Sequence, residues 1–144
     1  MDTALEKNWE VYALKYAVRS DRTRKDSFIF DDHSNDNHTI DYFIWVLKSE
    51  DSIIVVDTGF DYDEAKRRNI PIERSPSEAL KFININSADV TDVIITHLHY
   101  DHAGGLSEFP KANFHLQEDE MAYATGPCMC CLLYTSDAAD DLLC

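Results

Sequence analysis

The sequence predicts a mixed α/β (α+β) fold in which two sheets are faced by helices. Apolar segments with the character of β-strands come early in the chain, and strands then alternate with helical segments in the second half. Each sheet and each helix must bury one apolar face, so this order favours layers in which helices cover sheets. With 144 residues, the chain is long enough for one domain with a sizeable core and too short for two.

The first half is predicted to contain three strands. Residues 9–19 alternate between apolar and polar side chains, which is typical of a half-buried strand. Residues 42–47 are a continuous apolar run rich in aromatic and β-branched side chains, and residues 52–57 repeat this pattern with β-branched residues at 53–56, so both are predicted as buried strands. The polar link at residues 49–51 suits a hairpin between them.

The second half alternates helices with strands. Residues 63–69 predict a short helix, and a second helix begins around Pro76, since proline suits the first helical position. Residues 93–95 predict a short buried strand, residues 112–116 another strand, and residues 117–124 a helix. The strand at 93–95 leads directly into residues 97–102, which contain several potential metal ligands.

Charge and composition limit the partners that we expect. The formal net charge of −14 argues against nucleic acid as a partner and against binding to an anionic membrane surface. The chain shows no secretory signal at its start and no stretch of the ~20 apolar residues that a membrane span needs, so we expect a cytoplasmic protein. All four cysteines lie in the last 17 residues, which argues against a disulfide framework for the fold.

The densest cluster of metal-ligating side chains contains His97, His99, Asp101 and His102. Alternate side chains of an extended segment share a face, so His97, His99 and Asp101 are expected to converge, with a turn bringing His102 to the same point. Imidazole and carboxylate are natural ligands of Zn²⁺ and similar divalent ions. Four ligands exceed what one catalytic ion takes from one segment, so we predict two ions, with His97 and His99 on the first and Asp101 and His102 on the second.

The surroundings of this cluster make it more specific than its histidines alone. Gly104 and Gly105 follow it, and glycines let a backbone approach a crowded site closely. A solvent-exposed histidine-rich loop is the alternative, but the apolar strand before the cluster and the glycines after it argue against that interpretation. The acidic loop at residues 31–38 is predicted to be solvated, His115 to be structural and Phe60 to belong to the core.

Two segments resemble motifs of a known family. Residues 96–105 (Thr-His-Leu-His-Tyr-Asp-His-Ala-Gly-Gly) resemble the signature motif of the metallo-β-lactamase superfamily, and residues 55–59 (Val-Val-Asp-Thr-Gly) resemble its upstream aspartate motif. Residues 9–16, 41–47 and 114–129 are similar to the N-acyl homoserine lactonase-like branch. The resemblance implies the N-terminal half of an αββα sandwich, two zinc or other divalent ions per intact domain, and opening of the lactone ring of N-acyl homoserine lactones.

The resemblance also implies roles for individual residues. Asp57 would orient the metal-binding histidines, although a cap at the end of a strand explains it equally well from sequence alone. Asp101 would act as the catalytic residue, holding the second metal and passing a proton. The family's remaining ligands, a histidine, a bridging aspartate and a further histidine, match no residue after His102. Another hydrolase of this fold, a glyoxalase-II-like thioesterase or a β-lactamase, is the alternative, as is a metal-binding fragment without activity.

The end of the sequence differs in character from the rest. Residues 131–141 read Cys-Leu-Leu-Tyr-Thr-Ser-Asp-Ala-Ala-Asp-Asp, which matches a common transposon-based sequencing adapter translated in one frame. A short acidic helix is the alternative interpretation. We therefore expect a truncated metallo-β-lactamase-fold domain over residues 1–130 and an adapter artefact over residues 131–144, and we expect the chain by itself to be inactive.

Overall fold

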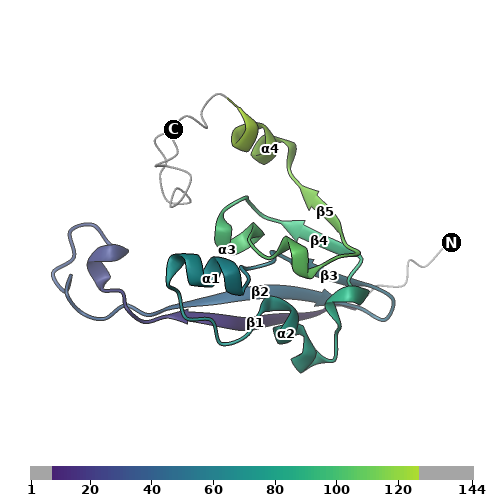
Figure 1. Cartoon of the computed structure of the whole chain (residues 1–144), viewed down its shortest axis with the longest axis horizontal. Coiled ribbons are helices and arrows are strands. Elements are labelled where there is room, and N and C mark those ends of the chain that lie inside the picture. The colour runs from purple at the N-terminus through teal and green to yellow at the C-terminus, as the bar shows by residue number, and fades with distance from the viewer. Residues whose placement is uncertain (1–7, 127–144) are drawn as a thin grey trace.

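The five strands in residues 8–126 form a single mixed sheet in the order β1-β2-β3-β4-β5 (Figure 1). The computed structural model describes residues 8–126, so the expected boundary at residue 130, the segment 131–144 and the cysteines lie outside the described residues. β1 to β3 are antiparallel, whereas β3, β4 and β5 run parallel. The α/β class is confirmed, but residues 8–126 contain one sheet where two were expected. The strands are β1 (Glu10–Arg19), β2 (Ile40–Lys48), β3 (Ile53–Val56), β4 (Asp92–Ile95) and β5 (Asn113–Leu116).

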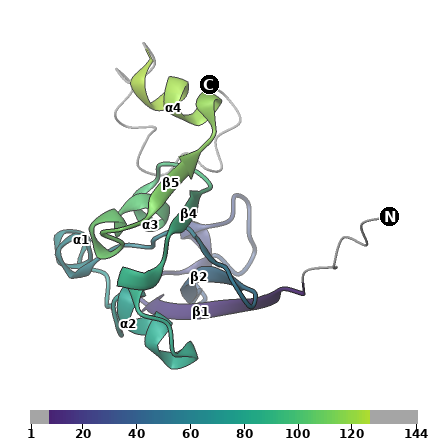
Figure 2. The ribbon, with the colours of Figure 1, turned by 90° about the vertical axis from the view of Figure 1, so that its right-hand side faces the viewer.

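The predicted helices are present, together with a one-turn helix inside the histidine cluster. Helices α1 to α3 lie on one side of the sheet, and α4 follows β5 at its edge (Figure 2). None of the helices in residues 8–126 is long and apolar enough to cross a membrane. The helices are α1 (Tyr62–Arg68), α2 (Pro76–Leu80), α3 (Tyr100–Ala103) and α4 (Glu118–Thr125), and 3₁₀ turns span Arg24–Asp26, Lys81–Ile83, Ser87–Asp89 and Leu106–Glu108.

Local sequence explains where the first two helices begin and end. Asp61 accepts a hydrogen bond from the Glu64 backbone N–H at the start of α1, and Asn69 ends that helix in the left-handed conformation. Ser75 and Glu78 form a reciprocal capping box at the start of α2, with Pro76 in the first turn as predicted. These caps satisfy backbone groups that a helix end leaves without partners.

The hydrophobic core lies between the sheet and the helices. Side chains from β1 to β4 meet the apolar faces of α1 and α2, together with Phe60 and Phe109. Complete burial of such side chains contributes roughly 1.5–3 kcal/mol each to folding. The largest fully buried members of this core are Tyr16, Ile44, Val46, Val55, Phe60, Leu80, Val90, Val93 and Phe109.

The opposite face of the sheet is also apolar. Trp45 pairs with Val56 across β2 and β3, and Val56 pairs with Ile94 on β4, so these side chains share that face. Phe43 lies on it too, and Phe43, Trp45 and Ile94 are each about 40% exposed (42%, 47% and 38%). The prediction that residues 42–47 form a strand is confirmed, but in the described structure only one face of that strand is buried.

A β-bulge in β1 connects the sheet to the histidine cluster. The register shifts between Lys15 and Ala17, so Tyr16 is the extra residue. Its ring lies against Gly59, whose φ is +62°, and a Cβ at Gly59 would stand 2.7 Å from the Tyr16 ring. The Tyr16 hydroxyl donates to the backbone oxygen of Asp101 at 3.3 Å. The bulge therefore links the edge strand of the sheet to the functional segment.

Candidate metal centre

The candidate site lies where β3 and β4 end. The two strands are parallel neighbours, so the residues that follow them lie at the same edge of the sheet. The carboxyl ends of parallel strands are where α/β folds usually bind ligands. Asp57 follows β3 and His97 follows β4, while His99 occupies the cap position before α3. Asp101 was expected to continue an extended segment, and this was wrong, because α3 begins at Tyr100 and carries Asp101 on a helical turn.

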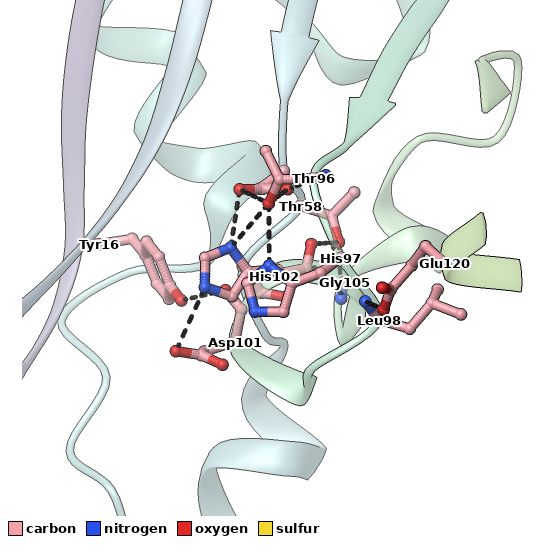
Figure 3. Close-up of polar contacts among 11 residues, drawn as sticks. Tyr16, Thr58, Thr96, His97, Leu98, Asp101, His102, Gly105 and Glu120 are labelled. Carbon is pink, nitrogen blue, oxygen red and sulfur yellow. Dashed lines mark hydrogen bonds and ion pairs between the residues drawn. The ribbon is translucent and has the colours of Figure 1, made fainter. Parts of the chain in front are cut away.

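The three histidines of the cluster come together, and Figure 3 shows His97 beside His102. The ring centroids of His97 and His102 are 3.8 Å apart, and those of His97 and His99 are 4.6 Å apart. Asp101 places Oδ2 3.7 Å from Nε2 of His102. Among residues 8–126, no group of three or more His, Cys, Asp or Glu side chains is arranged to hold a metal ion as it stands. The assignment of particular ligands to two ions stays a prediction.

Asp57 is a buried carboxylate with three hydrogen bonds. Oδ1 accepts from the backbone N–H of Thr96 at 2.8 Å, the Thr96 hydroxyl donates to it at 2.9 Å, and Nδ1 of His102 donates to Oδ2 at 2.7 Å. The residue has a φ of +63°, a conformation that aspartate and asparagine adopt more readily than most side chains. Asp57 therefore both closes the end of β3 against β4 and holds one histidine of the cluster.

The hydrogen bonds also fix which imidazole nitrogens carry protons. The Thr96 hydroxyl donates its single proton to Asp57, so it accepts from Nδ1 of His97 at 3.1 Å. His102 likewise uses Nδ1 as its donor to Asp57. In the neutral form of each ring, Nε2 is then the nitrogen without a proton, and Nε2 of His97 is buried without a hydrogen-bond partner in the described part of the chain. A buried acceptor without a partner is costly, and a metal ion would satisfy it, so the donor set fits a divalent cation.

The two histidines differ in the direction of their pKa shifts. Burial lowers the pKa of His97, and the neighbouring His102 and His99 lower it further. Burial also opposes the charge on His102, but the hydrogen bond to Asp57 and the negative charges of Asp101 and Asp57 outweigh it, so the pKa of His102 is raised. His97 therefore loses its imidazolium proton at a lower pH than His102, and the neutral imidazole is the form that binds metal.

Thr58 holds the chain that leaves the cluster. Its hydroxyl donates to the backbone oxygen of His102 at 3.0 Å and accepts from the N–H of Gly105 at 3.1 Å. A Cβ at Gly105 would stand 2.5 Å from the backbone oxygen of Thr58. Glycine is thus needed at position 105 for a close approach of the backbone, as predicted. The group that it approaches is the backbone of Thr58, whereas the prediction was the metal site itself.

A cavity of about 380 Å³ opens beside the histidines. One wall is Tyr42 and Tyr100, whose hydroxyl oxygens are 3.4 Å apart, and the guanidinium of Arg68 stacks 3.5 Å from the Tyr100 ring centroid. Burial and the Tyr42 hydrogen bond raise the pKa of Tyr100, so its phenol stays protonated. The cavity is lined by Arg22, Lys25, Asp26, Ser27, Phe28, Ile29, Ile40, Tyr42, His97, His99, Tyr100, Asp101 and His102.

Comparison with known proteins identifies the family. Residues 41–117 match the sequence profile of the Metallo-beta-lactamase superfamily. This chain belongs to the metallo-β-lactamase superfamily. A hydroxyacylglutathione hydrolase of Saccharophagus degradans is 32% identical over 87 residues, which cover 59% of this chain and 26% of the relative. The N-acyl homoserine lactonase AttM of Azorhizobium caulinodans is 42% identical over 48 residues, covering 33% of this chain and 18% of that enzyme.

A solved structure of a lactonase shows the same fold. The dizinc quorum-quenching lactonase AidC, in complex with a product, superposes with a TM-score of 0.56 at 21% identity, over 82% of this chain and 46% of that one. The chain thus spans less than half of that structure and about a quarter or less of the two sequence relatives. The metallo-β-lactamase fold predicted from the motif is confirmed.

Within this superfamily fold, the structure separates the residues at the site from those outside it. Asp57 and the four cluster residues lie together, whereas His115 binds Asp92 on the neighbouring strand at 2.8 Å and Phe60 is fully buried, as predicted for both. No role was predicted for Thr96, which contacts the histidines, or for Thr58, which holds the backbone that leaves the cluster. The available signal was their position, since each adjoins a motif aspartate or histidine at the end of a buried strand.

Proposed function

We propose that this chain provides part of a two-zinc site that opens the lactone ring of N-acyl homoserine lactones. The observation that carries the proposal is that His97 and His102 both use Nδ1 for hydrogen bonds within the fold, which leaves Nε2 for a metal, and that Nε2 of His97 is buried without a partner beside the cavity. The lactonase AttM, 42% identical over its matched segment, supports the lactone as the substrate. AidC, described as a dizinc lactonase, shares the fold and supports zinc as the metal.

The proposed ligands are His97, His99, Asp101 and His102, and bound zinc would polarise the substrate carbonyl and lower the pKa of water. Asp57 holds His102 so that its Nε2 faces the site. Asp101 lies beside that nitrogen and would take up and release the proton of the reaction. The protonated phenol of Tyr100 would donate to the substrate and help to hold it in the cavity.

A thioester is the second candidate substrate, and two observations favour it. The hydroxyacylglutathione hydrolase matches a longer segment, 87 residues, than the lactonase does. Arg22 and Lys25 also line the cavity, and they would attract an anionic thioester more strongly than a neutral lactone. Replacing Lys25 with glutamine therefore discriminates between the two, because it should weaken turnover of an anionic substrate and leave a neutral one unchanged.

We also propose that the 144-residue chain binds zinc without turning substrate over, and that hydrolysis needs a longer parent located in the cytoplasm. Within residues 8–126, the cluster lacks a three-ligand arrangement for one ion. The test measures hydrolysis of N-hexanoyl homoserine lactone, S-lactoylglutathione and a cephalosporin by the parent gene product and by this chain. Preferred turnover of the lactone by the parent is expected, and preferred turnover of either other substrate would refute the lactonase assignment.

Metal binding by this chain gives a separate test. At a zinc concentration about 100 times the dissociation constant, binding should stabilise the folded chain by about 2.7 kcal/mol. Replacing both His97 and His102 with alanine should abolish that gain, whereas the same change at His115, which pairs with Asp92, should leave it intact. Equal stabilisation of all three chains in thermal unfolding would show that zinc binds elsewhere.

A further inference from the structure

We propose that Glu120 is a positioning residue for the candidate metal centre, and this inference rests on the proposed function. Its carboxylate Oε1 accepts a hydrogen bond from the backbone N–H of Leu98 at 2.9 Å (Figure 3). Leu98 stands between His97 and His99, two of the proposed ligands. A movement of its backbone would therefore carry both imidazoles with it.

The contact belongs to an arrangement that holds the segment from both neighbouring strands. β4 lies between β3 and β5 in the sheet. The Thr96 N–H donates to Asp57, which follows β3, and the Leu98 N–H donates to Glu120 in α4, which follows β5. Two carboxylates thus bind the backbone N–H groups on either side of His97. Hydrogen bonds to ionised acceptors are roughly twice as strong as neutral ones, which suits them to fixing a segment outside a regular ladder.

The end of the sheet explains why a side chain takes this role. The β4–β5 ladder ends at the pair Ile95 and Leu116, and the chain then turns into α4. No strand residue of β5 therefore lies opposite Leu98 in the described structure, and the carboxylate of Glu120 takes the place of the next backbone acceptor.

The position of Glu120 distinguishes it from its acidic neighbours. Glu118 and Asp119 share the first turn of α4, where negative charge is favourable at any helix N-terminus. Both are exposed, whereas Glu120 is half-buried and directed at the motif. None of the residues of α4 within the described chain is fully buried, so packing alone does not explain how this helix is held against the site.

The test compares Glu120→Ala with Glu118→Ala, a matched change in the same turn. The first readout is hydrogen exchange of the Leu98 amide, which should quicken about tenfold or more in Glu120→Ala. The second is Co²⁺ affinity followed by the visible absorption of the bound ion, which should fall about 10- to 100-fold. Glu118→Ala should stay within about twofold of the unaltered chain in both readouts, and Glu120→Gln should restore most of the affinity, because its amide oxygen still accepts.

Several results would overturn the inference. Unchanged exchange at Leu98 would show that the hydrogen bond does not hold the backbone, and faster exchange with unchanged Co²⁺ affinity would show that holding it does not position the ligands. If Glu120→Ala fails to fold by circular dichroism, hydrogen exchange of the Leu98 amide in Glu120→Gln against Glu118→Gln decides, and about threefold faster exchange is expected in Glu120→Gln alone.

A failure of the proposed function would look different. If the unaltered chain binds no Co²⁺, the metal centre itself is wrong. The positioning role is then decided by the nuclear Overhauser effect between the His97 and His102 rings, whose centroids are 3.8 Å apart. Glu120→Ala should weaken this effect and Glu118→Ala should not, and equal intensity in both variants would refute the role.

Discussion

Replacing Asp57 with asparagine should change the proton position on His102 without changing the shape of the site. Asparagine tolerates the left-handed conformation that Asp57 adopts at φ +63°, so the backbone strain is similar. Its amide oxygen can still accept from the Thr96 N–H. Its amide nitrogen, however, would face Nδ1 of His102 across 2.7 Å, and both groups would then be donors.

A change of the His102 tautomer would remove this clash between two donors. If the proton of His102 moves to Nε2, Nδ1 can accept from the asparagine, but Nε2 is then no longer free to bind metal. Two hydrogen bonds also change from charge-assisted to neutral, which should lower the free energy of unfolding by about 1–3 kcal/mol. Loss of an orienting carboxylate typically costs about 10- to 100-fold in metal affinity.

Nitrogen-detected NMR of the His102 ring reads the tautomer directly. Urea unfolding without and with Zn²⁺ gives the free energy of unfolding and the stabilisation by the metal. Asp92→Asn is the matched control, since Asp92 also bonds a histidine, His115, at 2.8 Å but on the exposed sheet surface. It should change the free energy of unfolding by less than about 0.5 kcal/mol. If His102 keeps its proton on Nδ1 in Asp57→Asn, or if zinc affinity equals that of the control, the proton assignment is wrong.

Two further predictions concern the parts of the fold that support the site. Glu64 is held by Arg67 and Arg68, which bring its pKa down to about 2, so its contribution to stability is present above about pH 4.5 and is lost as the pH falls towards 2. Glu64→Gln should therefore be less stable than the unaltered chain by up to about 1 kcal/mol at pH 7 and equal to it near pH 2, and a constant difference across urea titrations would refute the ion-pair explanation. Gly59→Ala should lose about 2–4 kcal/mol, because it combines a left-handed φ with a Cβ 2.7 Å from Tyr16, and Gly59→Ala combined with Tyr16→Leu should recover part of that loss.

Most of the strands could be predicted because their pattern is local. The apolar run at residues 42–47 lies within β2 (Ile40–Lys48), and residues 93–95 lie within β4 (Asp92–Ile95). The bulge at Tyr16 left no comparable signal, since Tyr16 and Ala17 are both apolar and both buried. An alternating pattern predicts a strand but does not show where an extra residue breaks its register.

The candidate site was predictable as a set of residues and not as an arrangement. The types and spacing of His97, His99 and His102 indicated metal chemistry, and the structure brings their rings together. The predicted backbone conformation was wrong at Asp101, because the extended segment ends at His99, which caps α3. A short helix of four residues has too few positions to show a helical period in the sequence.

The cluster's chemistry depends on residues that donate nothing to a metal. Each neutral imidazole has one proton and two nitrogens, so its metal-binding atom is chosen by whatever occupies the other nitrogen. For His102 that group is Asp57, 45 residues away in the chain, and for His97 it is Thr96, whose own proton is already committed to Asp57. One carboxylate at the end of β3 therefore sets the tautomers of two histidines after β4. The parallel pairing of these strands is what brings the three groups together, and no spacing within the motif contains that information.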